Sequence, residues 1–93
     1  MGQIALIALG SNQKSAWGDV AETVREAGLR VAKLSLAAVK VSRFYQNPAF
    51  PPGAGPDYTN AVVAIETALD PHALLAALHR IEAAAGRERT RRW

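Results

Sequence analysis

Three stretches of the chain carry the hydrophobic pattern of β-strands. Residues 4–9 form an uninterrupted apolar run that ends at a Gly-Ser-Asn turn, which predicts a central strand. In residues 36–45 apolar and polar side chains alternate, which predicts a second strand with one polar face. Residues 58–67 are rich in β-branched side chains, so we expect a third strand there.

Two other stretches have the three-to-four-residue spacing of an amphipathic helix. Asp19 and Glu22 have the spacing of a capping box, so the first helix is expected to begin at Val20. Its apolar face would consist of Val20, Val24, Ala27, Val31 and Leu34. Gly28 lies inside this pattern and weakens a helix by about 1 kcal/mol relative to alanine, so the helix could also end there.

The second helix is expected to begin at Pro71 behind an Asp70 N-cap and to end at Gly86. Its apolar face would consist of Leu74, Leu75, Leu78, Ile81 and Ala85. Between the second and third strands, residues 47–56 contain four prolines and two glycines. No regular element can cross such a segment, and a loop of this length is often functional.

The resulting order, β-α-β-β-α, is that of a ferredoxin-like α+β domain with an antiparallel sheet and one further strand, β-α-β-β-α-β. We therefore expect a single domain over residues 1–93, with the final strand missing from this chain. In that topology the final strand pairs beside the first. Residues 4–9 would then be an apolar edge, which favours aggregation or pairing with another chain.

Composition narrows the classes of protein. The chain is 49% hydrophobic and 20% charged, a globular balance, and it has no cysteine, which excludes disulfides and thiolate metal sites and suits the cytoplasm. No apolar run approaches the ~20 residues of a membrane span, and we identify no export signal. The net charge of +3 comes entirely from residues 87–93, because residues 1–86 are balanced. Such an arginine cluster binds the phosphates of a nucleotide or a nucleic acid, or is a solvated tail.

Candidate chemistry lies on both sides of the proline-rich loop. Phe50, Tyr58 and Asn60 offer aromatic faces and a carboxamide, which suit a flat heterocycle with a lactam edge but also suit core packing and a turn. His79 and Glu82 share a helix face, either as a binding pair or as an ordinary exposed contact. The sequence contains no Ser-His-Asp set, no P-loop and no metal-binding cluster.

Five short motifs occur in a characteristic order. They are Gly-Ser-Asn at 10–12, Ser-Arg-Phe-Tyr-Gln-Asn-Pro at 42–48, Pro-Asp-Tyr-Thr-Asn-Ala at 56–61, Ile-Glu at 81–82 leading into Gly-Arg-Glu-Arg at 86–89, and Arg-Trp at 92–93. In this order and spacing the chain resembles the 6-hydroxymethyl-7,8-dihydropterin pyrophosphokinase family over nearly its whole length. The resemblance implies a ferredoxin-like fold and a role in folate biosynthesis. The implied reaction transfers pyrophosphate from MgATP to the hydroxymethyl oxygen of the pterin, giving AMP.

The resemblance also implies roles for individual residues. The pterin would be bound by Asn47, Pro48, Phe50, Tyr58 and Asn60. ATP would be bound by His79, Glu82, Arg92 and Trp93, and the catalytic arginines would be Arg87, Arg89 and Arg92 of a mobile loop. Asn47 stands where the family often has threonine, and His79 where some members have glutamine. This interpretation requires the pterin residues and the nucleotide residues to face one cavity.

The magnesium ions have no expected ligands in this chain. The family holds two Mg²⁺ ions with an Asp-x-Asp segment that follows the Arg-Trp pair, and no such pair occurs here. We therefore expect these ligands in a missing C-terminal segment, and we expect no turnover from this chain alone. We expect small-molecule substrates, no nucleic acid or membrane partner, and a monomer for the intact enzyme.

Two alternatives stay open. Ferredoxin-like domains include RNA-binding modules, and the arginine cluster could contact phosphates, but residues 4–9 and 61–65 lack the aromatics on which such modules stack bases. The chain could also be a pterin-binding protein without catalytic activity.

Overall fold

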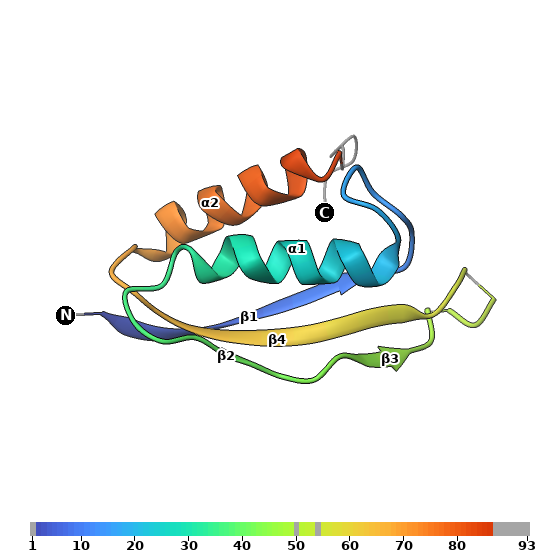
Figure 1. Cartoon of the computed structure of the whole chain (residues 1–93), viewed down its shortest axis with the longest axis horizontal. Helices are drawn as coiled ribbons and strands as arrows, with labels where there is room; N and C mark the ends of the chain where they lie inside the picture. Colours follow the sequence, from blue (N-terminus) through green and yellow to red (C-terminus); the bar gives the residue numbers. More distant parts are fainter. Residues whose placement is uncertain (1, 50, 54, 87–93) are drawn as a thin grey trace.

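Two helices cover one face of an antiparallel sheet (Figure 1). The computed structural model describes residues 2–49, 51–53 and 55–86. The elements are β1 (Gln3–Ser11), α1 (Val20–Ala32), β2 (Lys40–Val41), β3 (Tyr45–Asn47), β4 (Tyr58–Thr67) and α2 (Pro71–Ala84). The predicted α+β, ferredoxin-like arrangement is confirmed.

β4 lies in the middle of the sheet. It pairs with β1 along the whole strand, from Gln3 opposite Thr67 to Ser11 opposite Thr59, and with β2 and β3 on its other side. Within the described residues β1 is therefore an edge strand, as the topology argument expected, although its apolar run by itself predicted a central one. Ile4 and Leu6 lie on the face away from the helices and are 70% and 71% exposed.

The first helix begins where the capping box predicted. The backbone N–H of Glu22 donates to Asp19 Oδ1 at 2.8 Å, and the N–H of Asp19 donates to Glu22 Oε1 at 2.9 Å. The helix continues to Ala32, so the alternative of an end at Gly28 is wrong. Val24 and Val31 are buried on either side of the glycine, and their packing offsets its low helix propensity.

The core lies between the sheet and the two helices. Ile7, Val31, Val63 and Ile65 are buried in one cluster, and Leu74, Leu78 and Ile81 of α2 pack against it. Leu75, which the pattern assigned to the same face, is half exposed. The predicted N-cap of α2 is confirmed, because Ala73 N–H donates to Asp70 Oδ1 at 2.8 Å. The C-cap residue is Ala85 and not Gly86, which follows it with a positive φ of 92°.

The prediction of a single strand over residues 36–45 is wrong. Two shorter strands, β2 and β3, are present instead, and a β-bulge separates them. From Val41 to Tyr45 the chain advances four positions, whereas their partners, Val63 and Asn60, are three positions apart. The pairing survives because Ser42 N–H donates to the Val62 carbonyl at 2.9 Å, and the Ser42 hydroxyl accepts from Val62 N–H at 2.8 Å.

The bulge changes which side chains face away from the helices. If the register of β2 continued without the bulge, Gln46 would oppose Tyr58, whereas in the structure Asn47 opposes Tyr58 and Tyr45 opposes Asn60. Since directly opposite residues point to the same face, Asn47 lies on the face that carries Tyr58 and Asn60.

Candidate functional site

Most of the predicted site residues that the structure describes lie at one end of the molecule. The end of β1, β3 and the start of β4 meet there, and the loop after β1 and the last turn of α2 lie above them (Figure 1). Segments far apart in the sequence are thus brought together around the C-terminal end of β1.

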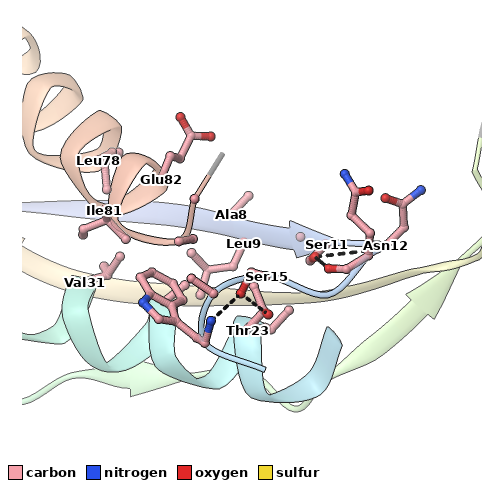
Figure 2. A pocket seen from close by; sticks show the side chains of 18 of the residues that line it. Ala8, Leu9, Ser11, Asn12, Ser15, Thr23, Val31, Leu78, Ile81 and Glu82 are labelled. Carbon is pink, nitrogen blue, oxygen red and sulfur yellow. Dashed lines mark hydrogen bonds between the residues drawn. The ribbon is translucent and has the colours of Figure 1, made fainter. Parts of the chain in front are cut away.

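A cavity of about 750 Å³ runs along the unpaired edge of β1. Its floor and inner wall come from β1 and the inward side of α1, and its other walls from the loop after β1 and from α2. In Figure 2, Ser11 and Asn12 lie at the tip of β1, Ile81 points toward Val31, and Glu82 projects on the other side of α2. The cavity therefore joins an apolar interior to a polar end.

Tyr58, His79 and Glu82 all line this cavity. Tyr58 comes from the start of β4, and the other two come from α2, so one space borders a predicted pterin residue and both described nucleotide residues. Asn47, Pro48 and Asn60 do not line it. Of the described pterin residues, Tyr58 alone shares this cavity with the two α2 residues, and Asn60 adjoins it through its strand partner Gly10.

The pterin candidates form a small cluster on the open face of the sheet. Asn60 Nδ2 donates a hydrogen bond to Asn47 Oδ1, and Asn47 Nδ2 donates to the Pro48 carbonyl at 3.5 Å. A methyl group built on Gly10 would lie 2.7 Å from Asn60 Oδ1 and 3.8 Å from Tyr58 Cδ2, so both side chains lie over that glycine. The cluster presents two carboxamides beside a 37%-exposed aromatic ring.

The loop after β1 is fixed to both helices. Ser15 Oγ and Thr23 Oγ1 of α1 are 2.6 Å apart in a hydrogen bond, and Trp17 N–H donates to Ser15 Oγ at 3.0 Å. Ala16 N–H donates to the carbonyl of Ala85 at 2.9 Å. These contacts hold the end of α2, and with it the turn that carries Glu82, over the tip of β1.

A second set of contacts secures the outer side of the same loop. The Arg30 guanidinium lies 4.5 Å from the centre of the Trp17 ring, and Arg30 Nε donates to Glu26 Oε2 at 2.9 Å. The ion pair is more than a third exposed, so it contributes little by itself, and the ring contact adds to its effect by covering Trp17.

Several predicted residues lie outside the described part of the chain. They are Phe50 of the pterin set and Arg87, Arg89, Arg92 and Trp93 of the nucleotide and catalytic set. Their roles stay predictions.

The structure adds residues that the sequence reading did not assign. Asn12 Nδ2 donates to the carbonyl of Pro56 at 3.4 Å and so connects the loop after β1 to the proline-rich loop. Lys14 lines the cavity and brings a cation to it. Gly10 and Asn12 belong to the Gly-Ser-Asn motif, which contributed to the family resemblance although no function was assigned to its residues. No pattern in the sequence pointed to Lys14.

The described residues do not form a metal site. No group of three or more His, Asp or Glu side chains in residues 2–49, 51–53 and 55–86 could hold an ion. In the same part of the chain, neither helix has the length and apolarity to cross a bilayer.

Comparisons with known proteins agree with one another. The family model for 7,8-dihydro-6-hydroxymethylpterin-pyrophosphokinase matches residues 6–93. The chain is 43% identical over 90 residues to the 2-amino-4-hydroxy-6-hydroxymethyldihydropteridine pyrophosphokinase of Haemophilus influenzae, covering 96% of this chain and 54% of that protein. It is 41% identical over 90 residues to the protein of the same name from Pseudomonas putida, covering 96% of this chain and 71% of the relative. The chain thus spans about half the length of the first of these relatives.

Proposed function

This chain belongs to the 7,8-dihydro-6-hydroxymethylpterin pyrophosphokinase family, and we propose that it supplies the pterin-binding face and part of the ATP site of such an enzyme in folate biosynthesis. In the proposed reaction the hydroxymethyl oxygen of the pterin attacks the β-phosphorus of ATP. The bond from that phosphorus to the bridging oxygen of AMP breaks, and the hydroxyl proton is released. The pterin diphosphate and AMP are the products.

The cavity shared by Tyr58, His79 and Glu82 is the observation that carries this proposal. A pyrophosphoryl transfer needs the acceptor and the nucleotide side by side, because catalysis of this kind depends mainly on positioning and charge stabilisation. In this proposal Tyr58 stacks on the pterin ring, and Asn60 hydrogen-bonds to its lactam edge.

On the nucleotide side, we assign His79 and Glu82 to contacts with ATP. Both lie on the last turns of α2, which the Ala16–Ala85 hydrogen bond holds in place. Lys14 lines the same cavity and offers an ammonium group for a phosphate oxygen. Arg87, Arg89 and Arg92 would add guanidinium groups from the segment that follows α2, and Trp93 completes the proposed nucleotide set.

Magnesium does not fit the residues at hand. The described residues contain no cluster of metal ligands, and the 93 residues contain no Asp-x-Asp pair. We therefore assign no step to the metal and expect the 93-residue chain to bind ligand without turnover. A cytoplasmic location, which the absence of cysteine suits, stays a prediction.

Pterin fluorescence tests the proposal directly. We expect saturable quenching of 6-hydroxymethylpterin by the 93-residue chain, weakened roughly tenfold or more by Tyr58→Ala or Asn60→Ala, as for the loss of one stacking or hydrogen-bonding group. Thr59→Ala, a neighbour in the same strand, is the matched control. Absence of binding, or equal effects of all three substitutions, would refute the pterin assignment.

An assay of AMP formation separates binding from activity. We expect no AMP from ATP and the dihydropterin with this chain. Turnover that Glu82→Ala abolishes would show that the chain needs no further residues for catalysis and would overturn this part of the proposal.

A further inference from the structure

We propose that Asn47 and Gly10 are positioning residues that fix the orientation of the Asn60 carboxamide, so that it selects a heterocycle with one order of hydrogen-bonding groups along its edge. This inference rests on the proposed function, in which Asn60 contacts the pterin ring. It goes further because it assigns the selectivity to two residues that orient Asn60 and do not contact the ring with side chains of their own.

The bulge between β2 and β3 makes the arrangement possible. It places Asn47 opposite Tyr58 and on the same face as Asn60, one step along the sheet. Gly10 lies on the other side of Asn60, as its direct partner in β1. Asn60 is therefore held between two strands on the face of the sheet opposite α1 and α2.

One hydrogen bond directs the carboxamide, and the space over one glycine accommodates it in that orientation. Asn60 Nδ2 donates to Asn47 Oδ1, which directs the nitrogen toward β3. A Cβ atom on residue 10 would lie 2.7 Å from Asn60 Oδ1, so the oxygen occupies the space that the glycine leaves over β1. Asn47 Nδ2 in turn donates to the Pro48 carbonyl, which keeps Asn47 Oδ1 available as the acceptor.

A fixed carboxamide can select a ligand that a rotating one cannot. After its bond to Asn47, Asn60 keeps one N–H donor and the Oδ1 acceptor. Such a pair complements a ring edge with a carbonyl oxygen beside an N–H, as in the lactam form of a 2-amino-4-hydroxypteridine. A 2,4-diaminopteridine presents the reverse order, an amino group beside a ring nitrogen. A carboxamide free to turn by 180° would fit both edges, whereas a fixed one fits only one.

Ligand titrations test this selectivity with matched variants. The probes are 6-hydroxymethylpterin and 2,4-diamino-6-hydroxymethylpteridine, titrated into the wild-type chain, Asn47→Ala and Asn47→Asp. We expect the wild-type chain to prefer the lactam by roughly tenfold or more, since a site built for one hydrogen-bonding pattern rejects the reverse. Asn47→Ala should reduce the preference to about threefold or less, and Asn47→Asp, which keeps an acceptor for Asn60 Nδ2, should restore it.

Gln46→Ala is the control, because it removes an exposed carboxamide from the adjacent position of β3. It should leave the preference unchanged. If Asn47→Ala weakens both ligands by the same factor, Asn47 acts only in stability or general affinity, and the inference is overturned. If the wild-type chain binds neither ligand, the proposed function itself fails.

Nuclear magnetic resonance tests the orientation without any ligand. We expect slow rotation and slow hydrogen exchange for the side-chain amide of Asn60 in the wild-type chain, and both should become faster in Asn47→Ala. Gly10→Ala should shift the same two signals while the backbone spectrum of α1 and α2 stays unchanged. An Asn60 side-chain amide that already exchanges freely in the wild-type chain would refute the inference, whatever the titrations give.

Discussion

Ala16 and Ala85 are joined by a backbone hydrogen bond of 2.9 Å, although 69 positions separate them in the chain. The bond connects the loop after β1 to the end of α2, the two segments that meet over the tip of β1. The geometry of the cavity therefore depends on how firmly this loop is held to the body of the domain.

The part-buried hydroxyl pair of Ser15 and Thr23 should contribute measurably to that attachment. Thr23 is 9% exposed, and its hydroxyl donates to the Asp19 carbonyl at 2.8 Å while it contacts Ser15 Oγ. Thr23→Val keeps the volume and removes these bonds, so we expect a loss of about 1–2 kcal/mol in the free energy of unfolding.

Urea unfolding followed by circular dichroism measures this loss, with Thr59→Val as the control. Thr59 lies in β4 opposite Ser11 and Gln46, so its substitution leaves the Ser15–Thr23 pair intact. Equal midpoints for the two variants would contradict a role for the hydroxyl pair.

Gly28 should be a site where alanine stabilises the protein. A methyl group there would lie 3.6 Å from Leu9 Cδ1, an ordinary van der Waals contact, and the residue is in the interior of α1. We expect Gly28→Ala to raise the free energy of unfolding by about 0.5–1 kcal/mol, because alanine loses less backbone entropy in a helix.

Gly18 should show the opposite effect on the free energy of unfolding when it is replaced by alanine, measured by the same urea unfolding. Its φ is +127°, and a Cβ atom would collide with Glu22 Oε1, the oxygen that closes the capping box. Gly18→Ala should therefore destabilise the protein by more than about 1 kcal/mol. The same sign for both substitutions would show that local backbone conformation does not decide the outcome.

The two histidines of α2 should differ in their effect on nucleotide binding. His79 lines the cavity, whereas His72 lies near the start of α2 and does not. We expect His79→Ala to weaken ATP binding by roughly three- to tenfold, the effect of one lost hydrogen bond, while His72→Ala leaves the affinity unchanged. Isothermal titration calorimetry measures both. A larger effect for His72→Ala would remove His79 from the proposed ATP site.

The unpaired edge of β1 should make the 93-residue chain associate. In the described residues nothing pairs with that edge, and residues 3–11 of the strand carry no charge. Edge strands without charges are templates for pairing with another chain. Sedimentation velocity over a concentration series should therefore show dimers or larger species.

A charge on the edge strand tests the cause of that association. Leu6→Lys, at a side chain that is 71% exposed, should shift the protein toward the monomer. Leu29→Lys is the matched control, because Leu29 lies on α1 and is 55% exposed. A wild-type chain that stays monomeric throughout, or equal effects of the two lysines, would contradict association through β1.

The elements that the sequence predicted best are those fixed by local chemistry. The side chains of Asp19 and Asp70 accept hydrogen bonds from N–H groups only three positions further along the chain. The starts of both helices can therefore be predicted from the local sequence. The bounds of β4 agree with the prediction because the segment is rich in β-branched residues along its length.

Features that depend on distant partners were not predictable in the same way. The bulge after Val41 requires Ser42 to pair with Val62, which lies 20 positions along the chain. The contact between Asn47 and Asn60 depends on that bulge. For the site, the family resemblance named Tyr58, His79 and Glu82, but the cavity that they share and the presence of Lys14 in it follow only from the packing of α2 over β1.

The bulge also has a consequence for how related sequences should be aligned. The bulge holds one residue more than the facing part of β4, so a relative that lacks one residue between Val41 and Tyr45 would pair without a bulge and still place Asn47 opposite Tyr58. A relative of equal length that paired without the bulge would instead place Gln46 on the ligand side, because side chains alternate along a strand. A gap of one residue in this segment is therefore compatible with an unchanged binding face, whereas a gap placed after Tyr45 would compare the wrong residue with Asn47.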